Sequence, residues 1–256
     1  MSASASSPSR LDRSVYTGVR LGIMQPYFFP YLGYFSLIAC TDRWIVFDPV
    51  QYIRKGWMNR NRVLKKGGGW KYIGVTVEPH DRSTLIKDIH LPSEPDRFDR
   101  IIRHLDHYKA VHAPHYDAVL ALLEECLRPE SQSLVAFNTN CLERTCSYLG
   151  LAFDHEVYSD MALAHTEARE PGDWALHISR SLGAGAYVNP PGGRGIFDLE
   201  RFRQAGVKLL YLEQELPPYE QRTNTFEPGL SIIDVMMFNA PPAIRDMLQQ
   251  HRLVSE

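Results

Sequence analysis

Short apolar runs and helix signals alternate along most of the chain. Six runs have the length and composition of strands: 20–24, 44–48, 70–77, 157–158, 186–189 and 207–212. Three stretches between them carry helix signals: 34–40, 171–182 and 197–205. Strands that alternate with helices are typical of βαβ units, so the pattern predicts an α/β fold with a mainly parallel sheet flanked by helices.

The middle of the chain is helical. Apolar residues recur at helical spacing in three successive stretches: 97–108, 116–127 and 134–149. They predict a helical insertion around residues 96–150, within a single α/β domain that spans residues 19–250, because no linker separates two units. Residues 1–18 are rich in Ser and Ala and predict a disordered leader.

Composition narrows the class of protein. The chain has 256 residues, of which 44% are hydrophobic and 23% charged, as in ordinary globular proteins. No apolar run reaches the roughly 18 to 20 residues that a membrane-spanning helix needs, and the leader lacks the apolar segment of a secretory signal. We therefore expect a cytoplasmic protein without membrane insertion. The four cysteines form no C-x-x-C pair, which argues against a zinc knuckle or a disulfide framework.

Positive charge is concentrated in one segment. Between Asp48 and Glu78 there are seven Lys or Arg residues and no acid, so this segment carries +7, the rest of the chain −9 and the whole chain −2. The asymmetry predicts a local anion site and a phosphorylated or carboxylated small-molecule substrate. The glycines at 67–69 lack the spacing of a Walker loop. Aromatic residues between the cations are also typical of single-stranded nucleic acid platforms, but the overall acidity argues against such a partner.

Two prolines and several aromatic residues follow the first predicted strand. The prolines restrict the backbone, and the amide of Gln25 with the rings of Tyr27 and Tyr34 combines hydrogen bonding with stacking. We expect these three side chains to line a substrate pocket at the carboxyl edge of the sheet. The alternative is an aromatic loop that plugs the end of the sheet.

Asp48 ends the second predicted strand and precedes a proline. Because open α/β folds bind ligands at this edge, Asp48 is the best candidate for a catalytic base, with metal ligand and turn cap as alternatives. Polar side chains that follow are expected to bind substrate: Gln51, Tyr52, Asn59, Arg60, Asn61 and Arg62. In this hypothesis the arginines bind a phosphate or carboxylate and the asparagines orient it. A solvated cationic face is the alternative.

Other candidates lie in the second half of the chain. His165 precedes a predicted helix and is a candidate acid or base, although helix capping explains most of the neighbouring residue types without any chemistry. Asn189 begins a turn that either exposes amide groups to an anion or simply crosses between elements. Asp234 has capping-box spacing from Ser231, so a structural role is favoured over substrate binding. Four histidines between positions 104 and 115 lack a carboxylate at a recognised spacing, so no metal site is expected.

Several motifs occur in a specific order along residues 19–240. They are Gln25-Pro26, Gly33-Tyr34, Asp48, Gln51-Tyr52, Asn59-Arg60-Asn61, the segment 108–114, Phe226 and the Leu-Ser-Ile-Ile-Asp run at 230–234. In this order they resemble the WbqC-like protein family. The resemblance implies a bacterial protein encoded among genes for lipopolysaccharide O-antigen and other sugar or natural-product pathways, with transfer of an amino-acid or acyl unit as the proposed type of reaction. The chain departs from the family pattern at residues 189–191 and 240–242.

Together these features predict a biosynthetic transferase that joins an activated acyl, aminoacyl or phosphate-bearing small molecule to an amine or hydroxyl acceptor. The hypothesis requires the loop at 25–34, Asp48 and the segment 59–62 to meet around one cavity. A non-catalytic binding or scaffold protein for a nucleotide-sugar intermediate is the first alternative. A nucleic-acid-binding or nucleic-acid-modifying protein is the second. The sequence identifies no cofactor.

Overall fold

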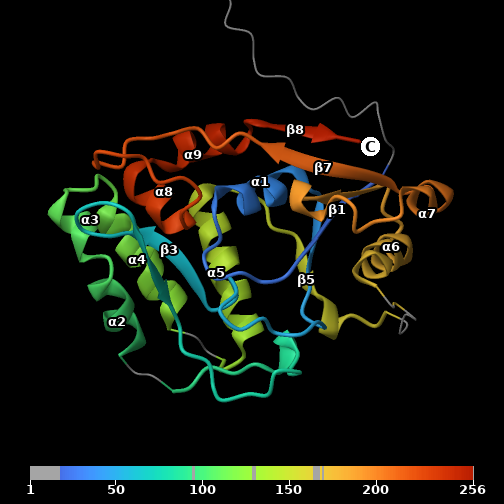
Figure 1. Ribbon diagram of the computed structural model, residues 1–256, viewed down its shortest axis with the longest axis horizontal. Coiled ribbons are helices and arrows are strands. Elements are labelled where there is room, and N and C mark those ends of the chain that lie inside the picture. The colour runs from blue at the N-terminus through green and yellow to red at the C-terminus, as the bar shows by residue number, and fades with distance from the viewer. Residues whose placement is uncertain (1–17, 94–95, 129–130, 164–167, 169, 256) are drawn as a thin grey trace, which may run out of the picture.

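The computed structural model describes residues 18–93, 96–128, 131–163, 168 and 170–255 (Figure 1). Residues 1–17 of the predicted leader and the candidate acid or base His165 lie outside these ranges. Within them, no helix is both long enough and apolar enough to span a membrane.

A six-stranded sheet in the order β5-β2-β1-β6-β7-β8 forms the centre of the fold (Figure 1). Its strands are β1 (Arg20–Met24), β2 (Arg43–Val46), β5 (His155–Val157), β6 (Ala186–Asn189), β7 (Lys208–Gln214) and β8 (His251–Val254). Neighbouring strands pair in parallel except β7 and β8, which are antiparallel. The predicted α/β fold with a mainly parallel sheet is confirmed, although the sequence pattern did not predict β8.

Helices cover both faces of the sheet. Side chains alternate between the two faces along each strand, so each strand contributes to a core on either side. Val46 and Val188 belong to the core on one face, and Ile23 and Tyr187 to the core on the other. The first face is covered by α1 (Leu32–Cys40), α5 (Leu134–Leu149) and α9 (Pro241–Leu248), the second by α6 (Pro171–Ser181) and α7 (Leu199–Gln204). Burial on both faces explains why the strands are recognisable as continuous apolar runs.

A separate antiparallel hairpin pairs β3 (Arg60–Leu64) with β4 (Trp70–Gly74). The strand predicted at 70–77 therefore exists but does not join the main sheet. The sequence did not predict β3, whose first three residues are polar. Gly74 allows a close approach of the chain, since a Cβ at this position would lie 2.2 Å from the carbonyl oxygen of Asn59.

The helical insertion contains α2 (Arg97–Arg103), α3 (Asp106–Ala110), α4 (Tyr116–Leu127) and α5, with α8 (Ile232–Phe238) packed against α4 and β3. The predicted helical region is thus confirmed, but the helix predicted at 97–108 is two helices. The chain tightens at Leu105, whose backbone N–H bonds to the carbonyl of Ile102 only three residues earlier. Short 3-10 turns occur at η2 (Ile86–Asp88), η3 (Tyr158–Asp160) and η4 (Pro191–Gly193).

Candidate functional site

The order of the strands places a topological switch point between β1 and β6. From β1 the chain passes through α1 to β2 on one side, whereas β6 and then β7 lie on the other side. Ligands of open α/β sheets bind outside the carboxyl ends of the strands at such a point. Gln25 follows β1 directly, Asn189 is the last residue of β6, and Asp48 lies two residues beyond β2. Three of the predicted site residues thus share this edge.

Asp48 is paired with Ser159, which follows β5 at the same edge of the sheet. The Ser159 backbone N–H donates to one carboxylate oxygen at 3.1 Å, and its hydroxyl donates to the other at 2.5 Å. Asp48 is 1% exposed, whereas Ser159 is exposed. Burial raises the pKa of the Asp48 carboxyl, and the hydrogen bonds from Ser159 partly offset this rise. No motif marks Ser159 in the sequence, although its position just after a predicted strand was a usable signal.

Three aromatic rings pack beside this pair. Phe47, Tyr158 and Trp174 meet in edge-to-face contacts, with ring centroids 5.4 to 5.7 Å apart. Phe47 precedes Asp48, Tyr158 precedes Ser159, and Trp174 lies in the first turn of α6. The start of α6 is therefore fixed against the two loops that carry the Asp48–Ser159 pair.

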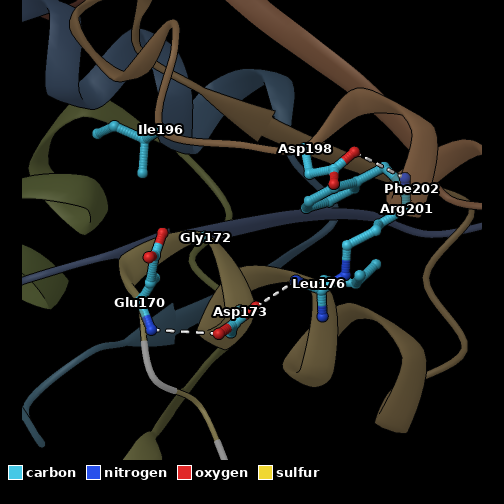
Figure 2. A pocket seen from close by; sticks show the side chains of 8 residues that line it. All are labelled: Glu170, Gly172, Asp173, Leu176, Ile196, Asp198, Arg201 and Phe202. Carbon is cyan, nitrogen blue, oxygen red and sulfur yellow. Dashed lines mark hydrogen bonds and ion pairs between the residues drawn. The ribbon is translucent and has the colours of Figure 1, made fainter.

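The same turn of α6 forms one wall of a pocket of about 340 Å³ (Figure 2). The opposite wall is the start of α7, where the Asp198 carboxylate accepts a hydrogen bond from the backbone N–H of Arg201. Asp173 bridges the walls, since it accepts from the backbone N–H of Glu170 and pairs with the Arg201 guanidinium at 2.5 Å. Three carboxylates and one guanidinium line the pocket, which favours a cationic guest over an anionic one.

Asn189 is held at the end of β6 by its own neighbours. Its side-chain oxygen accepts from the Tyr187 hydroxyl at 2.8 Å, and its amide donates to the Pro190 carbonyl at 3.0 Å. Gly193 packs closely on it, because a Cβ there would lie 1.9 Å from the Asn189 amide nitrogen. The side chain fixes the turn after β6, and a direct contact with substrate stays a prediction.

The loop after β1 runs from the sheet edge to the hairpin. The buried Tyr34 of α1 donates its hydroxyl to the Gln25 carbonyl at 2.8 Å, and the Tyr27 ring lies 5.7 Å from the Tyr34 ring. Asn138, a fully buried residue of α5, donates to the carbonyls of Pro26 and Met58, both at 2.7 Å. Gln25, Tyr27 and Tyr34 are therefore brought together. No motif marks Asn138 in the sequence. The only signal of its role was that a polar residue stands within a largely apolar helix.

The two predicted asparagines of the hairpin bind backbone groups. Asn61 is buried and donates to the carbonyls of Phe28 and Phe29 at 3.1 and 2.8 Å. Asn59 accepts from the buried Tyr52 hydroxyl and donates to the Val75 carbonyl, both at 2.9 Å. The Asn61 contacts join the hairpin to the loop after β1, whereas the Asn59 contacts join the start of the hairpin to Tyr52 and to the chain that follows β4.

Replacing Asn61 by alanine is expected to lower the free energy of unfolding by about 2 kcal/mol, because two buried carbonyls lose a donor. Urea denaturation of the variant measures this loss. Asn224→Ala removes an exposed amide and should change stability by less than about 0.5 kcal/mol. Equal stability of the two variants would show that Asn61 does not anchor the loop.

Arg60 and Arg62 stack on aromatic rings of the hairpin region. The Arg60 guanidinium lies 3.9 Å from the centre of the Tyr72 ring, and Arg62 lies 5.2 Å from Trp70 and 5.6 Å from Trp57. Among the described residues, no hydrogen bond or ion pair joins either arginine to Asp48. The predicted anion clamp and the predicted base are therefore not in direct contact, and the hairpin that carries the arginines is bonded to the loop after β1 through Asn61. The remaining predicted residue here, Gln51, is exposed and donates to the Arg82 carbonyl.

A family model described as the WbqC-like protein family matches residues 25–246. The chain belongs to the WbqC-like protein family. It is also 27% identical over 240 residues to a protein of Mycobacterium tuberculosis (strain ATCC 25618 / H37Rv) named uncharacterized protein Rv1507c, across 91% of this chain and 99% of the relative. No solved structure gives a significant match.

Asp234 of this WbqC-like protein lies at the centre of a buried polar cluster. Its carboxylate accepts from the hydroxyls of Tyr108 and Tyr219, both at 2.5 Å, and from the Gln221 amide at 3.0 Å. Ser231 caps α8 by accepting from the backbone N–H of Ile233 at 3.2 Å. The predicted start of a helix is confirmed, while the Asp234 side chain points to this cluster. Burial raises the pKa of Asp234 to about 6.

This raised pKa predicts a pH-dependent stability. Folded Asp234 holds its proton more tightly than an unfolded Asp with a pKa of about 3.9, so acid favours the folded state. The stabilisation that comes from the raised pKa of Asp234 is complete below about pH 4 and is lost as the pH rises through about 6. Between about pH 8 and about pH 5, we expect wild type to gain about 1.4 kcal/mol relative to Asp234→Asn, measured by urea unfolding. A difference that does not change with pH would contradict the raised pKa.

The described ranges contain no group of three or more His, Cys, Asp or Glu side chains arranged to hold a metal ion. All four cysteines are free and buried.

Proposed function

We propose that this WbqC-like protein is a cytoplasmic biosynthetic transferase that joins an activated acyl, aminoacyl or phosphate-bearing unit to an amine in a sugar or natural-product pathway. One observation carries the proposal: the buried carboxylate of Asp48 is hydrogen-bonded to the hydroxyl of Ser159, an exposed residue, at the edge where open α/β sheets bind ligands. A carboxylate with a raised pKa is suited to accept a proton near neutral pH.

In the proposed reaction the acceptor nitrogen attacks the activated carbonyl or phosphoryl group of the donor. The new bond forms to nitrogen while the bond to the leaving group breaks, and the leaving group departs with that electron pair. The proton released by the acceptor passes to the Ser159 oxygen as the Ser159 proton passes to Asp48. Ser159 thus acts as a relay, because Asp48 is too buried to meet a substrate directly.

The neighbouring pocket favours an amine over a hydroxyl acceptor. Glu170, Asp173 and Asp198 supply three carboxylates against the single guanidinium of Arg201 (Figure 2). A protonated amine is attracted to such a site and becomes the nucleophile once it has released one proton to water, whereas a neutral sugar hydroxyl gains nothing from the charge. The first turn of α6 joins the pocket to the aromatic rings beside Asp48.

The test is a panel of aminoacyl, acyl and nucleotide-sugar donors, each incubated with the protein and with amino or hydroxy acceptors. Mass spectrometry should detect a product whose mass equals the acceptor plus the transferred unit, formed with amino acceptors only. Calorimetry with the same compounds distinguishes the alternatives. Binding without any product would favour the scaffold function for a nucleotide-sugar intermediate, and binding only of single-stranded oligonucleotides, lost steeply with salt, would favour nucleic-acid recognition.

A further inference from the structure

A second cavity, of about 710 Å³, lies between the β3–β4 turn, α3 and the segment 222–227. Figure 1 shows α3 and β3 at the opposite side of the molecule from α6, so this cavity is separate from the site at the sheet edge. None of the catalytic steps proposed above uses it.

The charged groups that line this cavity are mainly cationic. Lys65, Lys66 and Arg222 contribute three positive charges against the single carboxylate of Glu227. Arg222 donates to the carbonyls of Val111 and His112 at 2.7 and 2.5 Å, which fixes its side chain on the wall formed by α3. Its backbone has a φ of 52°, a left-handed conformation that is costly for a non-glycine residue. The strained segment thus holds a cation at the cavity.

His107 lines the same cavity, and its ring makes no hydrogen bond within the part of the chain that the structure describes. The residue is 8% exposed, its ring centroid lies 4.0 Å from that of the Tyr108 ring in a tilted contact, and both ring nitrogens are buried without a partner among the described residues. Burial and the nearby Lys71 lower the pKa of His107 to about 4, so the ring is neutral and carries one N–H donor. An unpaired buried polar group is rare and costly, and a turn of the ring toward the cavity would give its N–H a ligand partner.

The glycines of the β3–β4 turn leave open space beside its backbone. Gly67 and Gly68 have φ values of 86° and 99°, and a Cβ on either would meet nothing within 4 Å. Close packing does not require glycine at these positions. The positive φ values favour it, and the missing side chains leave the backbone of the turn accessible. The Gly68 N–H already donates to the Lys65 carbonyl at 3.2 Å, so the exposed backbone of Gly67 is the part of the turn that is open to an anion.

We propose that this cavity binds the phosphoryl group of a small phosphate ester, such as a nucleoside diphosphate. Three cations and a glycine turn line a space that is much larger than an inorganic anion needs, and the His107 ring forms part of its wall. The rest of the ester fills the remaining volume. This site goes beyond the proposed transfer reaction, since it is a separate place where a phosphorylated molecule is held.

Calorimetric titration of the full chain with inorganic phosphate, pyrophosphate and uridine diphosphate tests the proposal. We expect the two diphosphates to bind more tightly than phosphate, and the Lys65→Ala/Lys66→Ala variant to bind them about tenfold to a hundredfold more weakly. Both lysines are exposed, so the variant should fold normally. Lys87→Ala, which removes an exposed cation outside the cavity, is the matched control and should bind like wild type.

Two-dimensional NMR locates the ligand independently of affinity. Uridine diphosphate should shift the backbone amide signals of Gly67 and Gly68 and the ring signals of His107. Unchanged affinity in the double lysine variant, shifts confined to other residues, or no binding at millimolar concentrations would each overturn the proposal. Because the readout is binding, these outcomes do not depend on whether the transfer reaction exists.

Discussion

Replacing Asp234 by alanine is expected to lower the free energy of unfolding by about 4 kcal/mol at neutral pH. Three buried donors, from Tyr108, Tyr219 and Gln221, would lose their shared acceptor. Each buried donor without a partner costs about 1 to 3 kcal/mol, and local relaxation recovers part of the sum. The three donors come from α3 and from the segment before α8, so the variant loosens contacts between distant parts of the chain.

Urea denaturation followed by circular dichroism measures this effect. Asp234→Asn keeps one acceptor oxygen and should lose less stability than the alanine variant. Asp246→Ala removes an exposed carboxylate on α9 and should change stability by less than about 0.5 kcal/mol. If Asp234→Ala stayed as close to wild type as that control, the polar cluster would not be a source of stability.

The main sheet was predictable because its strands are buried on both faces. Residues such as Ile23 and Val188 sit in cores on opposite faces, so each strand forms an apolar run that needs no partner to be recognised. The strand β3 was not predictable in this way. Its arginines are accommodated by stacking on Trp70 and Tyr72, and Asn61 by binding a distant loop. These contacts arise only from the folded arrangement.

The candidate site likewise has a part that the sequence pattern reveals and a part that only the folded arrangement reveals. The shared edge of Gln25, Asp48 and Asn189 was predictable because each stands at or just after the end of a recognisable strand, and parallel strands bring their carboxyl ends to one edge. The partner of Asp48 was not, since Ser159 lies 111 residues further along the chain with no motif around it. The roles of Asn59 and Asn61 likewise depend on the backbone groups they meet, which the sequence does not reveal.

Once a donor and an amine acceptor are identified, Asp48→Asn is expected to lower kcat by about a hundredfold to ten-thousandfold, the range for loss of a general base. The amide is similar in size; its oxygen can still accept the backbone N–H of Ser159 and its NH2 can donate to the Ser159 hydroxyl, so the fold should be retained while proton acceptance is lost. Burial raises the pKa of Asp48, and wild-type kcat should therefore fall as the pH drops through that raised value. The Asp48→Asn variant should lack this limb of the pH profile.

Two further variants separate a base from a structural role. Asp160→Asn neutralises the exposed carboxylate next to Ser159 and should keep nearly wild-type kcat. Ser159→Ala should lower kcat strongly, and combining it with Asp48→Asn should cause little additional loss, because residues that act in one proton relay are not additive. Turnover in Asp48→Asn that matches Asp160→Asn, measured at substrate saturation on a variant with wild-type unfolding behaviour, would rule out proton transfer through this pair.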